Sequence, residues 1–186
     1  MFIYLKITDQ FLYYQLYPSF FERVVYQQLY EYFDKNDYFY RSQYGFRKSH
    51  STEHAILEIV DKITHALDNR NNPLAIFLDL SKAFDTLNHH ILLKKLDYYG
   101  VKDLSHRWFY SYLSNREQYV LFKSSKFIHL PIQTGVPQGS ILGPLLYLIY
   151  MNDIQNSSSF FDFILYADDT TLYSSDTNKK IRYHMK

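Results

Sequence analysis

Cysteine is absent from the 186 residues, and glycine and proline occur only five times each. Without cysteine the chain has no disulfide, no thiolate zinc site and no cysteine nucleophile, which suits a reducing compartment. The longest apolar run, Ile141–Met151, contains Gly143 and Pro144 and is too short to span a bilayer. No secretory signal is visible, so we expect an intracellular protein, nuclear or cytoplasmic if expressed, without a membrane partner.

The residues that are present indicate a globular chain. Hydrophobic residues make up 47% and charged residues 21%, and 20 Lys and Arg against 19 Asp and Glu give a net charge of +1. That balance predicts no partner, because nucleic-acid binding requires local basic patches. The 20 Tyr and 15 Phe could stack on bases, although most of them fit core patterns.

Hydrophobic periodicity predicts the main elements. Helical spacing occurs in Phe20–Asp34, Glu53–Asn69, Asn88–Tyr99, Leu104–Leu113 and Leu145–Asn152. The continuous apolar run Leu74–Leu78 predicts a buried strand that ends at Asp79. Residues Gln118–Phe122 and Phe127–Ile132 predict a hairpin across Lys123–Lys126. Strands that alternate with helices indicate an α+β or α/β domain.

Two adjacent aspartates, Asp168 and Asp169, lie between two runs that read as strands. We predict that the pair, with Thr170, forms the turn of a hairpin. Two neighbouring carboxylates repel each other, and a hard divalent cation removes that repulsion. An ordinary turn is the alternative, because Asp is a common turn residue.

A third carboxylate makes the metal interpretation stronger. Asp79 ends the predicted buried strand, and carboxylates from separate strand ends form an all-oxygen site suited to Mg²⁺. Because neighbouring residues of an extended strand point to opposite faces, we expect Asp79 and Asp168 to be the main ligands and Asp169 an auxiliary one.

Four segments, taken in their order along the chain, resemble the motifs of one protein family. They are Gln43–Thr52 (QYGFRKSHST), Ala75–Asp85 (AIFLDLSKAFD), Gly135–Pro144 (GVPQGSILGP) and Tyr166–Asp169 (YADD). The last three resemble the palm motifs of reverse transcriptases, specifically of non-LTR (LINE-type, jockey-like) retrotransposons, and the first resembles the same family's fingers. The resemblance covers Phe20–Tyr173. Another palm polymerase, such as a group II intron maturase or telomerase, is the alternative.

The resemblance implies a fold and a reaction. The fold would be an α+β right-hand polymerase fingers–palm, with an antiparallel palm sheet packed on helices and the thumb missing. The reaction would be RNA-directed DNA synthesis, in which deoxynucleotides (dNTP) are added to a DNA primer on an RNA template. Two Mg²⁺ ions, with Mn²⁺ as a substitute, would be held by Asp79 and Asp168, with Asp169 beside them and the Leu80 carbonyl as a minor ligand.

The same resemblance implies roles for other residues. Phe84 would stack under the nucleotide sugar and exclude a 2′-hydroxyl; the alternative is a core Phe. Gln138 and Gly139 would line the nucleotide and template pocket; the alternative is an ordinary turn. Arg47 and Lys48 would approach template or phosphate; the alternative is a solvated cationic turn.

Both ends depart from the family pattern. The family has a Tyr-Arg-Pro-Ile-Ser phrase before the first fingers helix, and Thr8–Ser19 occupies that place here. Codons for Thr8–Ser19 can be chosen that spell the phrase in a shifted frame, so we hypothesise that residues 1–19 are an out-of-frame reading. Residues 174–186 are expected to be a frayed, truncated tail. A non-catalytic relic with no or weak nucleic-acid binding is therefore the alternative function.

Overall fold

The computed structural model describes residues 18–114, 116–118, 121–122, 125–126, 128, 130–137 and 139–176. The chain divides into two compact units. Unit 1 comprises Met1–Tyr38 and Lys82–Tyr150, and unit 2 comprises Phe39–Ser81 and Met151–Lys186. Each unit is therefore built from two segments that are distant in the sequence.

Unit 1 is mainly helical. Its elements are α2 (Pro18–Lys35), the 3₁₀ turn η1 (Ala83–Asp85), α4 (His89–Tyr98), α5 (Asp103–Leu113), α6 (Gly143–Met151) and the short strands β2 to β5. The four helices confirm the predictions made from periodicity. Their apolar stripes supply the core, which includes the fully buried side chains Leu29, Phe33, Leu92, Leu96, Phe109, Leu113, Leu145 and Leu146. Each such side chain contributes about 1.5–3 kcal/mol by burial.

Helix α6 is the most apolar helix of unit 1, and its residues from Leu145 to Ile149 are all buried. It has nine residues, whereas a helix that spans a bilayer needs about 20. No helix in the described ranges is long and apolar enough to cross a membrane.

The hairpin predicted between Gln118 and Ile132 is confirmed in outline. Strand β2 (Glu117–Gln118) pairs with β5 (Leu130–Pro131), and β3 (Leu121–Phe122) pairs with β4 (Ser125–Lys126), both antiparallel. The prediction placed Ser125 and Lys126 in the turn, and this was wrong because both residues are paired in β4.

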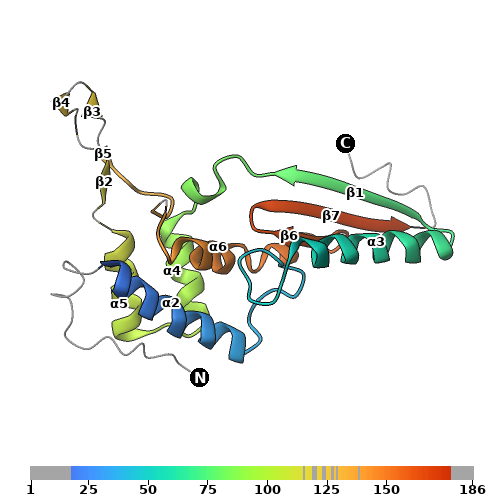
Figure 1. The fold of residues 1–186 in the computed structure, drawn as a ribbon, viewed down its shortest axis with the longest axis horizontal. Coiled ribbons are helices and arrows are strands. Elements are labelled where there is room, and N and C mark those ends of the chain that lie inside the picture. The colour runs from blue at the N-terminus through green and yellow to red at the C-terminus, as the bar shows by residue number, and fades with distance from the viewer. Residues whose placement is uncertain are drawn as a thin grey trace. The chain divides into compact units, whose positions relative to one another are not determined.

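Unit 2 packs one helix against an antiparallel sheet (Figure 1). Its elements are α3 (Thr52–Asp68), β1 (Asn72–Asp79), the 3₁₀ turn η2 (Ile154–Ser157), β6 (Asp162–Tyr166) and β7 (Asp169–Asp176). The strand order is β1–β7–β6, so β7 is central. Strand β7 extends to Asp176, which shows that Ser174–Asp176 are part of the sheet rather than of a frayed tail.

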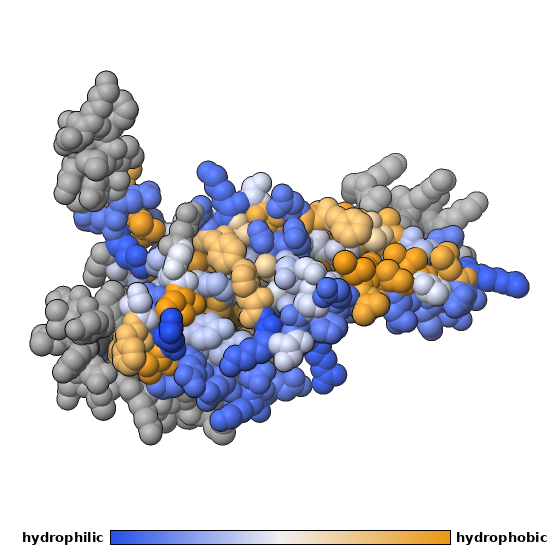
Figure 2. Space-filling view, viewed as in Figure 1, coloured by the Kyte–Doolittle hydropathy of each residue, from blue (hydrophilic) through white to orange (hydrophobic). Residues whose placement is uncertain are grey.

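Strand β1 differs from its prediction. None of its residues is buried, and Phe77 and Leu78 are 75% and 39% exposed. The apolar run predicted a buried strand, but β1 pairs on one side only within the described residues. Exposed apolar side chains also lie on α3, and Figure 2 shows hydrophobic residues gathered in this region; those on the helix are Ile56, Leu57, Val60 and Leu67.

Candidate active site

The hairpin between β6 and β7 closes earlier in the sequence than expected. Tyr166 pairs with Asp169, which leaves Ala167 and Asp168 as a two-residue loop. The predicted turn of Asp168, Asp169 and Thr170 was therefore wrong, because Asp169 and Thr170 are already paired in β7. Ala167 has a φ of 56°, and a positive φ at the first loop position only is the pattern of a type II′ turn. Such a φ costs a residue with a Cβ about 1–2 kcal/mol.

Asp79 lies directly opposite Asp169 across the β1–β7 ladder. Directly opposite residues of an antiparallel pair project from the same face, and like charges in this position destabilise the sheet. Both residues are exposed, and Asp168 in the adjacent loop is half-buried. No hydrogen bond or ion pair within the described residues engages these three carboxylates. This end of the sheet therefore carries negative charge that no cation among the described residues balances.

The pairing sharpens the expected ligand set. The prediction joined Asp79 to Asp168, whereas the register makes Asp169 the direct partner of Asp79. Within the described ranges, no three His or acidic side chains converge closely enough to hold a metal ion. The Asp79–Asp169 pair nevertheless fits a hard divalent cation, because its donors are carboxylate oxygens and a cation removes their repulsion. Leu80 follows Asp79 immediately.

The loop between β6 and β7 contacts segment 40–45. The resemblance assigned the part of this segment from Gln43 onward only to the fingers. Gln43 forms a parallel bridge with Leu165 near the end of β6. The Leu165 N–H donates to the Ser42 carbonyl, and the Tyr44 N–H donates to the Leu165 carbonyl, both at 2.8 Å. The buried Gln43 Oε1 accepts from the N–H of Gly45 at 2.8 Å and from that of Ala167 at 3.2 Å. Gln43 therefore links the segment to the hairpin loop.

Gly45 permits this close approach. A Cβ on Gly45 would lie 2.0 Å from the Ala167 nitrogen, which no side chain could tolerate. Glycine lacks a Cβ, so the backbone at Gly45 can come this close. The segment it approaches, 122 positions later, could not be identified from the sequence.

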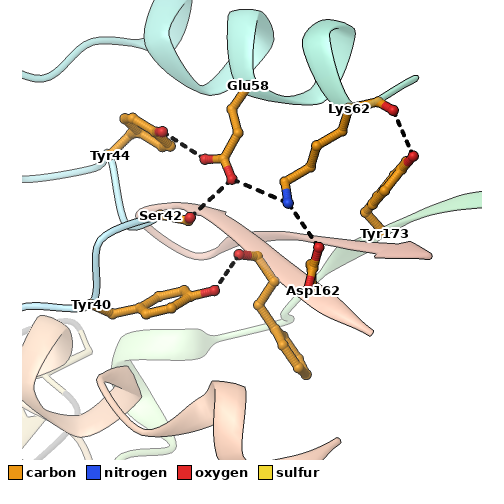
Figure 3. Close-up of polar contacts among 8 residues, drawn as sticks. Tyr40, Ser42, Tyr44, Glu58, Lys62, Asp162 and Tyr173 are labelled. Atoms are coloured by element: carbon orange, nitrogen blue, oxygen red, sulfur yellow. Dashed lines mark hydrogen bonds and ion pairs between the residues drawn. The ribbon is translucent and has the colours of Figure 1, made fainter. Parts of the chain in front are cut away.

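Polar side chains hold the same segment against α3 (Figure 3). The Glu58 carboxylate accepts from the hydroxyls of Tyr44 at 2.6 Å and Ser42 at 3.0 Å. Burial, followed by the hydrogen bond to Glu58, raises the pKa of Tyr44 to about 12. The Tyr40 hydroxyl donates to the Phe163 carbonyl at 2.7 Å, which attaches the segment to β6 as well.

Lys62 attaches α3 to the sheet. Its ammonium lies 2.7 Å from Asp162 Oδ2 and 3.8 Å from Glu58 Oε1, and its carbonyl accepts from the Tyr173 hydroxyl at 2.7 Å. Burial lowers the pKa of Lys62, but its hydrogen bond and charge interaction with Asp162 outweigh burial, so that the pKa is raised. Helix, segment and hairpin of unit 2 thus share one polar network.

Arg47 and Lys48 were predicted to approach template or phosphate. Arg47 donates from Nη1 to the Tyr40 carbonyl at 3.1 Å, and its guanidinium lies 5.2 Å from the centre of the Phe39 ring. In unit 2 this arginine therefore stabilises the loop from which it projects. Lys48 is exposed.

In unit 1, Phe84 lies beside the glycine-rich loop. Its half-buried ring is 4.6 Å from the ring of Tyr147 in α6, and its carbonyl accepts from the Val136 N–H at 3.0 Å. Gly135 has a φ of 83°, and a Cβ there would lie 2.9 Å from the Asp85 backbone. Gly139 is exposed with a φ of 76°, and Gln138 lies outside the described residues.

A cavity of about 860 Å³ borders this loop. Its charged lining residues are Lys82, Asp85 and Arg116, and segment 131–137 forms another wall. His89 places Nε2 2.6 Å from the Gly135 carbonyl and so supports the loop. No sequence pattern linked these two residues.

Comparison with known proteins identifies the family. Residues 20–186 match the family model described as reverse transcriptase (RNA-dependent DNA polymerase). The chain therefore belongs to the reverse transcriptase family, as the motifs predicted.

Relatives narrow the class to non-LTR retrotransposons. The chain is 36% identical over 148 residues to the Drosophila melanogaster "Probable RNA-directed DNA polymerase from transposon BS", which covers 72% of this chain and 16% of that protein. It is 33% identical over 141 residues to the "RNA-directed DNA polymerase from mobile element jockey" of the same species. That match covers 70% of this chain and 15% of the relative. The chain thus spans about one sixth of the length of these relatives.

Solved structures support the fold. The telomerase of Candida tropicalis, solved in complex with a fragment of telomeric RNA, aligns with a TM-score of 0.62 at 16% identity, over 93% of this chain and 31% of that one. This likeness confirms the α+β polymerase fold with its antiparallel sheet and helices.

Proposed function

We propose that this chain is the fingers–palm part of an RNA-directed DNA polymerase, which adds deoxynucleotides to a primer 3′-hydroxyl on an RNA template with two Mg²⁺ ions. The observation that carries the proposal is the placement of Asp79 opposite Asp169, beside the loop that presents Asp168. Three carboxylates from two motifs of the family lie at one end of one sheet.

The roles of the acidic residues follow from charge. Asp79, Asp168 and Asp169, with the Leu80 carbonyl, would hold the divalent ions. When bound, such ions lower the pKa of an attacking hydroxyl and neutralise charge on a leaving pyrophosphate. The protein's own contribution would be to hold Asp79 and Asp169 at paired strand ends, with Asp168 in the adjacent loop, before the ions bind.

The nucleotide sugar would meet Phe84. Its ring packs on the buried Tyr147, and its carbonyl is tied to Val136, so the ring cannot retreat easily from a bound nucleotide. A rigid ring at this point would exclude a 2′-hydroxyl and select deoxynucleotides. Gln138 and Gly139 would border the base pair, with Arg47 and Lys48 as weaker candidates for template contacts.

Primer extension on an RNA template with Mg²⁺ tests the proposal. Asp79→Asn and Asp168→Asn should each lower incorporation by about 100-fold or more, because transition-state charge loses its counter-ion. Asp61→Asn is the matched control, since Asp61 is an exposed aspartate on α3. Incorporation that survives both site substitutions would contradict the assignment.

A non-catalytic relic is the second candidate. It is favoured by the absence of a converged three-ligand cluster in the described residues. A wild-type chain that incorporates no nucleotide with either Mg²⁺ or Mn²⁺ would support this candidate.

A further inference from the structure

The geometry points to Gln43 as a positioning residue for the catalytic hairpin, with Gly45 as the residue that lets it act. Gln43 would fix the loop that carries Asp168 by accepting a hydrogen bond from the Ala167 N–H. This inference rests on the proposed function for its consequence, which is cation binding, while the hydrogen bond itself can be tested separately.

The loop requires external support. Ala167 holds a left-handed φ of 56° that residues with a Cβ disfavour. Strained backbone at a functional site persists only when surrounding structure holds it. The Gln43 Oε1, 3.2 Å from the Ala167 nitrogen, is the side-chain acceptor at this residue. The direction of Asp168, the next residue, follows from the conformation of Ala167.

The amide is suited to this role through its oxygen. Gln43 is 3% exposed, and its Nε2 has no hydrogen-bond partner within the described residues. Two N–H donors, of Gly45 and Ala167, converge on Oε1, so the amide orientation is determined by its acceptor. A side chain that served packing alone would gain by losing a buried, unpartnered donor. The contacts of Gln43 therefore favour a specific acceptor role.

The support around Gln43 is rigid. Ser42 and Tyr44 flank Gln43 and form backbone hydrogen bonds with Leu165. Their side-chain hydroxyls both donate hydrogen bonds to the Glu58 carboxylate on α3. Gly45 removes the Cβ that would otherwise lie 2.0 Å from the Ala167 nitrogen. The segment can thus reach the loop, and it cannot easily move away.

The test uses the 186-residue chain with ¹³C and ¹⁵N labelling. Amide exchange of Ala167 is measured by NMR, and Mn²⁺ affinity is measured by electron paramagnetic resonance, well below the unfolding temperature. Gln43→Met keeps the length and loses the acceptor, so Ala167 exchange should accelerate about fivefold to tenfold, as expected for one lost hydrogen bond. Mn²⁺ affinity should fall several-fold.

Two further variants separate positioning from folding. Gln43→Glu retains an acceptor oxygen in either protonation state, so Ala167 protection should return to within about twofold of wild type. Gln27→Met is the matched control, because Gln27 is an exposed glutamine of α2 whose side chain bonds Glu31 one turn away. Gly45→Ala should lower Mn²⁺ affinity more than Gln43→Met does.

The outcomes distinguish this inference from the proposed function. Unchanged Ala167 exchange in Gln43→Met would overturn the positioning role, whatever the chain binds. If Gln43→Met does not fold, the wild-type scalar coupling across the Ala167 N–H···Oε1 bond decides, and its absence overturns the role. If wild type binds no Mn²⁺, or Asp79→Asn leaves Mn²⁺ binding unchanged, the metal site is refuted while the exchange result still stands.

Discussion

Leu78 and Leu165 occupy equivalent places on opposite sides of the same strand, yet their environments differ. Both pair with Thr170 of the central strand β7, so all three residues lie in one row across the sheet. Leu165 is 1% exposed and Leu78 is 39% exposed. The two leucines therefore contribute differently to the stability of the fold, because burial depends on what covers each edge of the sheet.

The covering element on the β6 side is the segment that contains Gln43. Its backbone hydrogen bonds with Leu165 close that edge, whereas β1 has no second neighbour within the described residues. An edge strand leaves backbone donors and acceptors available for pairing. The comparison shows that one edge is completed by a short loop that also contacts the β6–β7 hairpin.

The largest expected effect is on stability. Leu165→Ala should lower the free energy of unfolding by about 2–5 kcal/mol, because it creates a cavity in packed core. Leu78→Ala, the matched substitution on the other edge, should cost less than about 1 kcal/mol. Urea unfolding curves measure both values, and equal losses would show that both edges are covered in solution.

A smaller effect is expected at alkaline pH. The folded-state pKa of Tyr44 is raised to about 12 from an unfolded value of 10.0, so the fold favours the neutral hydroxyl. Its contribution to stability is therefore complete below pH 10 and is lost as the pH rises through about 12. Deprotonation would repel Glu58 and loosen the cover of β6.

Amide exchange at Leu165 between pH 9 and pH 11.5 measures this loosening. The pH-dependent acceleration, after correction for intrinsic exchange, should be smaller in Tyr44→Phe than in wild type. Tyr110→Phe is the control, since Tyr110 is an exposed tyrosine of α5. Identical profiles for wild type and Tyr44→Phe would mean that Tyr44 does not hold the segment.

The smallest effects should have opposite signs on the two edge strands. Asp79→Asn removes the repulsion with Asp169 and should stabilise the metal-free chain by about 0.2–1 kcal/mol. Asp162→Asn on β6 removes a partly exposed ion pair with Lys62 and should destabilise it by no more than about 1 kcal/mol. Thermal unfolding with a chelator compares them, and destabilisation by Asp79→Asn would contradict the charge argument.

Local patterns predicted much of the fold. The helices α2 to α6 follow apolar spacing within single segments. The family motifs made Asp79, Asp168 and Asp169 the candidate ligands from the order of the residues alone. These features depend on neighbouring residues, so the chain order carries enough information. The α+β class and the reverse transcriptase family were predicted correctly for the same reason.

Long-range packing accounts for the differences. The hydrogen bond from Ala167 to Gln43 joins residues 124 positions apart, and no pattern within either segment predicts it. The apolar run of β1 predicted burial, but burial depends on a neighbour that lies elsewhere in the chain. Motif order thus made the three carboxylates candidate ligands. Their cross-strand register and the support of the hairpin loop depend on contacts between segments that only folding brings together.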